Sequence, residues 1–382
     1  NKTIGCTLLI IGTSIGAGML ALPLASGTTG FELASVVLIL IWALMTYTGL
    51  LVLEVNTSQS ENMDNFSSMA QTTAGPIAKI LSWICVICLL YSLTWAYISG
   101  GASILNPAIK YLLNSLHLKP LPASFNTMIG ASIFTLLLGI TLWHSTAAVD
   151  AINRSFISLK MVFLIICMAL LLPTVHNTYL SNVPQSMSTH HILSSIKLAP
   201  IFLASFGYHT VIPSLSMYHN KNHKMLKKAI IIGTSVPLIL YLLWLICTLG
   251  IVPLTGKLSF AGLAHSSNSV GDFTRTLIKI SNNSWVSFSI IAFTNIALVT
   301  SFLGVTLGLF DFIASVFKIP NTKSGRLLTT CITLSPPLIL FTLAPNGFLT
   351  ALKIAALFVI LLEIILPAWM AQTLRKKKIQ SN

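Results

Sequence analysis

Charged residues are scarce in this sequence, and acidic residues are the scarcest. Only 8% of the 382 residues are charged, and 8 Asp and Glu stand against 22 Lys and Arg. Soluble domains contain about 25% charged residues, so the composition excludes an ordinary water-soluble enzyme. Hydrophobic residues make up 54% of the chain, and the mean hydropathy is +0.85. A chain this apolar uses the lipid bilayer as its solvent.

The sequence also lacks a disulfide framework, a metal-binding motif and a cleavable signal peptide. All six cysteines lie within apolar runs, and no Cys and His residues have the spacing of metal ligands. We therefore expect no metal and no other cofactor. A net charge of +14 would indicate nucleic acid binding in a soluble protein. Here the basic residues occupy short loops, where they act as topology signals, so we expect lipid as a partner and no nucleic acid.

Ten apolar runs are long enough to cross a bilayer. About 20 apolar residues in a helix cover the hydrocarbon layer, whereas open strands in lipid would leave backbone groups unpaired. The sequence thus predicts an all-α integral membrane protein. The predicted spans are 4–24, 31–53, 77–105, 123–143, 155–173, 198–218, 229–252, 285–316, 327–344 and 347–370.

The basic residues predict the orientation of these spans. If the N-terminus is cytoplasmic, 15 of the 22 Lys and Arg lie at the inner face, as the positive-inside rule requires. The run from Lys221 to Lys228 and the tail from Arg375 to Lys378 contribute most clearly. We therefore expect both ends of this chain on the cytoplasmic side of a bacterial inner membrane. A basic tail can also bind anionic lipid.

Five spans precede the loop 174–197 and five follow it, so the two halves cross the membrane in opposite senses. This layout is typical of inverted-repeat transporters. We expect a first repeat at 1–173, an external connecting loop at 174–197, a second repeat at 198–370 and a basic cytoplasmic tail at 371–382. We expect the polar loop 54–76 to form a cytoplasmic cap and the loop 253–284 to carry short surface helices.

The first span of each half carries a matching interruption. Glycines and small residues occupy 12–18 in span 1, and Pro23 follows them. In span 6 the small residues are Ser205 and Gly207, and Pro213 follows them. Broken helices at equivalent positions indicate a midplane substrate site. Two other interpretations of 12–18 remain. It holds a G-x-S-x-G string, which in a hydrolase needs a preceding strand and a triad, and a GxxxG pair that favours close helix packing.

Three strings, taken in order, carry a resemblance to a known family. They are Gly-Thr-Ser-Ile-Gly-Ala-Gly-Met-Leu-Ala-Leu-Pro (12–23), Phe-Gly-Tyr-His-Thr-Val-Ile-Pro-Ser-Leu (206–215) and Thr-Ser-Phe-Leu-Gly-Val-Thr-Leu-Gly-Leu-Phe-Asp (300–311). With them the chain resembles the hydroxy/aromatic amino acid permease family over nearly its whole length, and most closely the bacterial tyrosine-specific permeases. The family usually has eleven helices. Since ten runs are present here, either the chain ends before the last helix or it lacks that helix.

The resemblance implies both a fold and a function. The fold is the five-plus-five inverted repeat (LeuT-type) of the amino acid/polyamine/organocation group, with helices 1 and 6 broken. The function is import of an aromatic L-amino acid, L-tyrosine before others, by proton symport through alternating access. Tryptophan, serine or threonine as substrate, and sodium as the coupling ion, stay open as alternatives. A channel would need repeated polar rings, which the sequence does not show.

The resemblance also assigns roles to residues in the two breaks and in span 8. Thr300 and Ser301 match the helix 8 positions that hold sodium in sodium-coupled relatives, so we expect both at the proton-coupling site, and Ser301 also belongs to the expected substrate site. The matched substrate-binding positions of the two breaks are Thr13, Ser14, Gly16, Ala17 and Gly18 in helix 1, and Phe202, Ser205, Phe206, Gly207 and Tyr208 in helix 6.

Charged residues inside the spans are the candidates for proton coupling. Lys160 lies about one and a half turns into span 5. It either snorkels to the surface or, as the resemblance implies, lies near helices 1 and 8 in place of sodium and carries the coupling proton, since a buried lysine can gain and lose a proton near neutral pH. Glu363 in span 10 is the second candidate. His209 beside the break of span 6 either binds a phenolic hydroxyl or satisfies a helix carbonyl.

Aromatic residues in span 3 are the candidates for the substrate ring. Tyr91 and Trp95 lie four residues apart and so share one helix face. Both lie near mid-span rather than at an interface, where Trp and Tyr often anchor a helix. We expect this face to stack on an aromatic substrate.

Overall fold

The computed structural model describes residues 2–58, 65–117, 122–181, 190–219, 221–264 and 269–381, and all the secondary structure in these ranges is helical. Parts of the predicted loops, residues 59–64 and 182–189, lie outside the described residues. The long helices are α3 (Phe31–Thr57), α5 (Pro76–Ser115), α6 (Ala123–His144), α7 (Thr146–Leu171), α11 (His223–Leu249), α14 (Ser284–Val316) and α15 (Lys323–Leu343).

Two predicted spans are interrupted, because non-helical residues separate shorter helices within each of them. Span 1 consists of α1 (Lys2–Ser14) and α2 (Gly18–Ser26), and span 6 consists of α9 (His190–Ser205), the 3-10 turn η2 (His209–Val211) and α10 (Ile212–Tyr218). Span 10 contains no such gap, because α16 (Phe348–Val359), the π-helical turn η3 (Ile360–Ile365) and α17 (Leu366–Ser381) follow one another directly.

The helices confirm the prediction of an all-α membrane protein. In the ranges that the structure describes, nine helices are long and apolar enough to cross a bilayer, or ten when the bent pair of α1 and α2 counts as one span. Large apolar side chains on one face of α6, including Leu136 at 65% and Ile140 at 56%, are exposed at the surface of the bundle. In lipid such a surface needs no polar cover.

Several helices extend beyond the predicted spans. Helix α5 continues ten residues past its predicted end at 105, and α7 begins at Thr146 instead of 155. The last helix runs to Ser381, so the predicted tail 371–382 is helical in its described part. Hydropathy marks where a helix meets lipid, whereas Ser145 at the N-cap of α7 marks where that helix begins.

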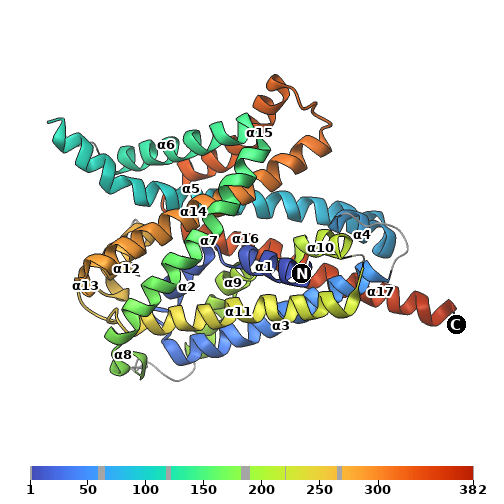
Figure 1. The fold of residues 1–382 in the computed structure, drawn as a ribbon, viewed down its shortest axis with the longest axis horizontal. Coiled ribbons are helices and arrows are strands. Elements are labelled where there is room, and N and C mark those ends of the chain that lie inside the picture. The colour runs from blue at the N-terminus through green and yellow to red at the C-terminus, as the bar shows by residue number, and fades with distance from the viewer. Residues whose placement is uncertain are drawn as a thin grey trace.

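The helices that carry the two interruptions lie in the middle of the bundle. Figure 1 shows α1, α9 and α16 between the long helices α3 and α11 on one side and α5 and α14 on the other. Helix α7 packs along α14, and α11 packs along α1. This arrangement surrounds both breaks with helices from both halves of the sequence.

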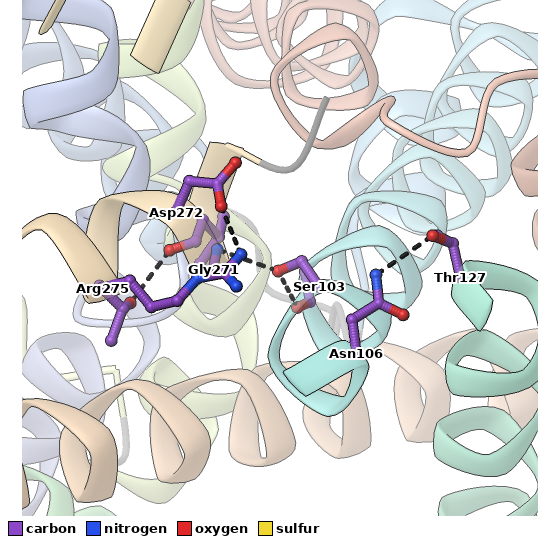
Figure 2. Close-up of polar contacts among 9 residues, drawn as sticks. Ser103, Asn106, Thr127, Gly271, Asp272 and Arg275 are labelled. Atoms are coloured by element: carbon purple, nitrogen blue, oxygen red, sulfur yellow. Dashed lines mark hydrogen bonds and ion pairs between the residues drawn. The ribbon is translucent and has the colours of Figure 1, made fainter. Parts of the chain in front are cut away.

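Short helices occupy the predicted loops, namely α4 (Phe66–Ala74), α8 (Asn177–Ser181), α12 (Phe260–Ala264) and α13 (Ser269–Ser281). Helix α13 packs on α2, α5 and α14. Figure 2 shows its contact with α5, where the Gly271 amide donates to Ser103 Oγ at 3.2 Å and Ser103 Oγ donates to the Gly100 carbonyl at 2.6 Å. The prediction of short surface helices in the loop 253–284 is confirmed.

Candidate functional site

The break in span 1 lies between Ser14 and Gly18. Helix α1 ends at Ser14, α2 begins at Gly18, and the two helix axes are bent by 50°. At the break the Gly16 amide turns back to the Ser14 carbonyl at 3.0 Å. A Cβ at Gly16 would lie 2.8 Å from Ser301 Oγ, and one at Gly18 would lie 3.0 Å from Ser205 Oγ. Glycine therefore lets α14 and α9 approach the broken segment closely.

Two side chains from other helices bind the backbone of this break. Lys160 of α7 donates from Nζ to the Ile15 carbonyl at 2.5 Å, and its side chain is buried, with 2% of the residue exposed. Ser301 of α14 accepts a hydrogen bond from the Ala17 amide at 2.9 Å. The Ile15 carbonyl follows the C-terminal end of α1, where the helix dipole favours a cation. The structure thus brings Lys160 together with the break of span 1 and with α14, which is span 8.

The break in span 6 lies between Ser205 and His209, and a tyrosine from α11 joins it to the first break. Tyr241 places its hydroxyl 2.5 Å from the Ser14 carbonyl and 2.8 Å from the Ser205 carbonyl. Each carbonyl belongs to the last residue of its helix, α1 or α9. The Tyr241 ring packs edge-on against Phe206 with ring centroids 5.2 Å apart, and both residues are fully buried.

Beyond the second break, a buried histidine–carboxylate pair ties three helices together. His209 Nδ1 lies 2.7 Å from Glu363 Oε2 in η3, and its Nε2 lies 2.8 Å from Thr48 Oγ1 in α3. The exposed fraction is 0% for the His209 side chain and 3% for that of Glu363. The other carboxylate oxygen, Oε1, would lie 3.6 Å from a Cβ at Gly207. The pair therefore borders the break directly.

The remaining candidates at the breaks pack into the same region. Tyr208 donates from its hydroxyl to the Met45 carbonyl of α3 at 3.1 Å, and Phe202 is fully buried. Ser14 is buried, and its hydroxyl has no hydrogen-bond partner within the described residues. Such an orphaned hydroxyl is uncommon in a protein interior, so Ser14 Oγ is available to a ligand.

Other candidates lie away from these contacts. Thr13 is exposed and donates to the carbonyls of Leu9 and Ile10 in its own helix. Thr300 likewise donates to the carbonyl of Ile296 on the preceding turn of α14.

The two aromatic candidates of α5 point to different neighbours. Tyr91 donates to the Ile332 carbonyl of α15 at 2.9 Å. The Trp95 ring is buried beside Gly347, whose added Cβ would lie 2.5 Å from it, and the indole Nε1 has no hydrogen-bond partner in the described ranges. The Tyr91 hydroxyl therefore belongs to the packing of α5 on α15, whereas Trp95 lies beside the N-cap residue of α16.

Two residues of the site were not among the sequence candidates. Tyr241 and Thr48 both lie inside long apolar runs, and neither has a charged neighbour in sequence. The one usable signal was that a mid-span tyrosine needs a partner for its hydroxyl. That signal does not tell which carbonyl the hydroxyl will find.

Comparison with known proteins identifies the family. The model of the tryptophan/tyrosine permease family matches residues 1–382. The chain belongs to the tryptophan/tyrosine permease family. It is 33% identical to the low affinity tryptophan permease of Escherichia coli K12 over 97% of this chain and 86% of the relative. It is 32% identical to tyrosine-specific transport system 2 of Haemophilus influenzae over 97% and 87% of the two chains, and 29% identical to the tyrosine permease of Enterobacter agglomerans over the same shares.

Membership of this permease family confirms the family resemblance found in the sequence. The chain is a multi-pass membrane permease and not an enzyme. The G-x-S-x-G string at 12–16 accordingly belongs to a broken membrane helix, because its first three residues end α1 where a hydrolase would have a strand, and its last two lie in the break before α2.

Proposed function

We propose that this permease is a secondary active transporter that imports an aromatic L-amino acid with a proton. It works by alternating access in a five-plus-five inverted-repeat fold of the LeuT type, with repeats at 1–173 and 198–370 joined by an external loop at 174–197. Both ends of the chain face the cytoplasm across a bacterial inner membrane. The observation that carries the proposal is the hydrogen bond from Lys160 Nζ to the Ile15 carbonyl in the break of helix 1.

Lys160 is suited to couple a proton to movement of the break. Its ammonium is buried, and among the described residues it forms no ion pair with a carboxylate. An ionisable residue in this position is costly and marks proton relays in transporters. When protonated, Lys160 offsets the partial negative charge at the C-terminal end of α1. When it loses the proton, that end of α1 loses its cation, and the break is released to change its conformation.

The two breaks offer complementary partners to the backbone of an amino acid. The N-terminal end of α2 at Gly18 favours the substrate carboxylate, whereas the Gly16 and Ala17 amides before it already donate to the Ser14 carbonyl and Ser301 Oγ. Carbonyls that end α9, at Ser205 and Phe206, favour the substrate ammonium. Phe202, Tyr208 and Trp95 supply the aromatic surroundings of the ring, and Trp95 Nε1, which has no hydrogen-bond partner among the described residues, offers a donor to a polar ring substituent.

L-tyrosine is the first candidate substrate, and L-tryptophan is the second. Tyrosine is supported by the resemblance of the strings at the two breaks to those of tyrosine-specific permeases and by the 32% identity to tyrosine-specific transport system 2 of Haemophilus influenzae. Tryptophan is supported by the 33% identity to the low affinity tryptophan permease of Escherichia coli. The breaks bind the shared amino acid backbone, so the aromatic surroundings decide between these two rings.

The test is uptake of radiolabelled L-tyrosine and L-tryptophan into proteoliposomes that contain the purified protein. An inward proton gradient is applied in sodium-free buffer, and unlabelled aromatic and hydroxy amino acids compete. We expect gradient-dependent accumulation that aromatic competitors block and that serine and threonine do not. Accumulation that needs sodium would overturn proton coupling, whereas competition mainly by serine or threonine would overturn the aromatic specificity.

A further inference from the structure

The Tyr241 hydroxyl lies where the two broken helices end. Its oxygen is 2.5 Å from the Ser14 carbonyl and 2.8 Å from the Ser205 carbonyl. Residues 14 and 205 are distant in sequence, and Tyr241 itself comes from α11, so one atom connects three helices.

The surroundings of Tyr241 fix this position. The residue is fully buried, and its ring packs edge-on against Phe206, the residue that follows the end of α9. The ring therefore has no solvent to which its hydroxyl can turn. A buried carbonyl at a helix end needs a donor. Tyr241 supplies one to Ser205, and to Ser14 it adds a second donor beside the Gly16 amide.

Electrostatics make this contact more than a pair of ordinary hydrogen bonds. The ends of α1 and α9 each carry partial negative charge from the helix dipole, and the two ends converge on one hydroxyl. Without a donor between them, the two ends would repel each other. Because the hydroxyl has a single proton, it serves the two carbonyls by sharing or alternation, and both helices must stay in place for it to do so.

We propose that Tyr241 is a positioning residue that joins the breaks of spans 1 and 6, so that the two breaks change conformation as one unit. Lys160 binds the Ile15 carbonyl, one residue from the Ser14 carbonyl that Tyr241 holds. A change at Lys160 therefore reaches the second break through Ser14, Tyr241 and Ser205. The role in transport rests on the proposed function, whereas the joining of the breaks is measurable without any substrate.

The first test is hydrogen exchange of the purified protein in lipid nanodiscs, without substrate. Tyr241→Phe keeps the ring and its contact with Phe206 and removes only the hydroxyl. We expect amides in both 14–19 and 205–211 to exchange about tenfold faster, which corresponds to the loss of one hydrogen bond. The matched control is Tyr91→Phe, which removes a hydroxyl that donates to the Ile332 carbonyl in α15. In that variant we expect both breaks to exchange as in the wild type.

Replacement of Tyr241 by p-aminophenylalanine provides a rescue that also covers a folding failure of Tyr241→Phe. The amino group keeps a donor at the same place, so we expect wild-type exchange at both breaks and a stably folded protein. Faster exchange at only one break in Tyr241→Phe, or at neither, would overturn the proposal. So would equal exchange in the p-aminophenylalanine and phenylalanine variants.

The second test measures whether joining of the two breaks affects the rate of transport. In proteoliposomes we expect Tyr241→Phe to lower kcat about tenfold while KM for the aromatic amino acid stays near the wild-type value. If the wild-type protein does not transport aromatic amino acids with protons, the proposed function fails and the exchange result still stands. If Tyr241→Phe loosens both breaks and leaves kcat unchanged, the joining is structural and its role in transport is wrong.

Discussion

Lys160 and Ile15 are 145 positions apart in the sequence, yet the Lys160 ammonium lies 2.5 Å from the Ile15 carbonyl in the middle of the bundle. The carbonyl is exposed to a side chain because α1 has ended at Ser14 and α2 has not yet begun. An unbroken helix would use this carbonyl for its own backbone hydrogen bond. The break thus creates the acceptor, and α7 supplies the cation that occupies it.

Replacement of Lys160 should separate substrate transport from the proton gradient. We expect Lys160→Ala to lose gradient-driven accumulation but to retain exchange of labelled for unlabelled substrate, because the amides of α2 remain. Lys160→Arg should also lose accumulation, since an arginine does not release its proton. Uptake into proteoliposomes with and without a pH gradient measures both effects.

The control for this prediction is Lys353→Ala. Lys353 also lies within an apolar span, but its side chain is exposed, so its loss should leave accumulation unchanged. Uphill uptake by Lys160→Ala at the wild-type level would show that the coupling proton is carried elsewhere, with Glu363 as the next candidate.

The buried pair of His209 and Glu363 should contribute strongly to stability. Removal of one member leaves the other polar group buried without its partner, which costs about 1–3 kcal/mol for an unsatisfied buried polar group. We expect His209→Ala and Glu363→Ala each to lower Tm clearly, and the double variant to cost less than the sum of the two. Thermal unfolding in detergent checks this, and additive losses would mean that the two side chains do not act as a pair.

An exposed ion pair gives the matched control. Arg275 and Asp272 of α13 interact one turn apart at the surface, where an ion pair contributes about 0–1 kcal/mol. Arg275→Ala should therefore change Tm little. A loss as large as that of His209→Ala would show that the measurement reports something other than the buried pair.

The fold was largely predictable because its signals are local in sequence. The length of each apolar run predicts a span, and Gly16, Gly18 and Gly207 mark where two of the spans are interrupted. The helix ends were less predictable. Helix α5 continues to Ser115 through residues that are too polar for the hydrocarbon layer, because a helix does not have to stop where the lipid does.

The site was only partly predictable because its contacts join distant segments. The family resemblance placed Lys160 near spans 1 and 8. In the structure Lys160 and Ser301 both form hydrogen bonds with the backbone of the break in span 1. No local pattern links Tyr241 to Ser14, 227 positions away. His209 and Glu363 were each singled out, but their pairing depends on the packing of η2 against η3 and is not visible in either sequence segment.

The contact between Gly16 and Ser301 predicts a pair of compensating substitutions. A Cβ at Gly16 would lie 2.8 Å from Ser301 Oγ but 3.9 Å from Ser301 Cβ. Gly16→Ala should thus destabilise the break by about 1–3 kcal/mol through overpacking and reduce uptake. Ser301→Ala removes the clashing oxygen, so the double variant should regain part of the Tm lost in Gly16→Ala.

Gly308→Ala in α14 is the control, because a Cβ there meets nothing within 4 Å. It should fold and transport as the wild type does. Ser301→Ala alone is also measured, because it removes the acceptor of the Ala17 amide. If Ser301→Ala lowers Tm as much in the Gly16→Ala background as in the wild type, the glycine is needed for backbone freedom and not for the close approach of α14.

Substitution of Gly207 should change substrate recognition without changing stability. A Cβ there would lie 3.6 Å from Glu363 Oε1 and 3.8 Å from the Ala204 carbonyl, which are ordinary contacts. We therefore expect Gly207→Ala to keep a Tm close to that of the wild type.

We also expect Gly207→Ala to have a higher KM for the aromatic amino acid, because the added methyl group narrows the space in which a ligand would contact the carbonyls of the break. Uptake of labelled substrate into proteoliposomes measures KM, and Tm measured on the same protein preparation distinguishes the two effects. A normal Tm with a normal KM would remove Gly207 from the substrate site, whereas a large drop in Tm would show that the break needs the backbone freedom of glycine.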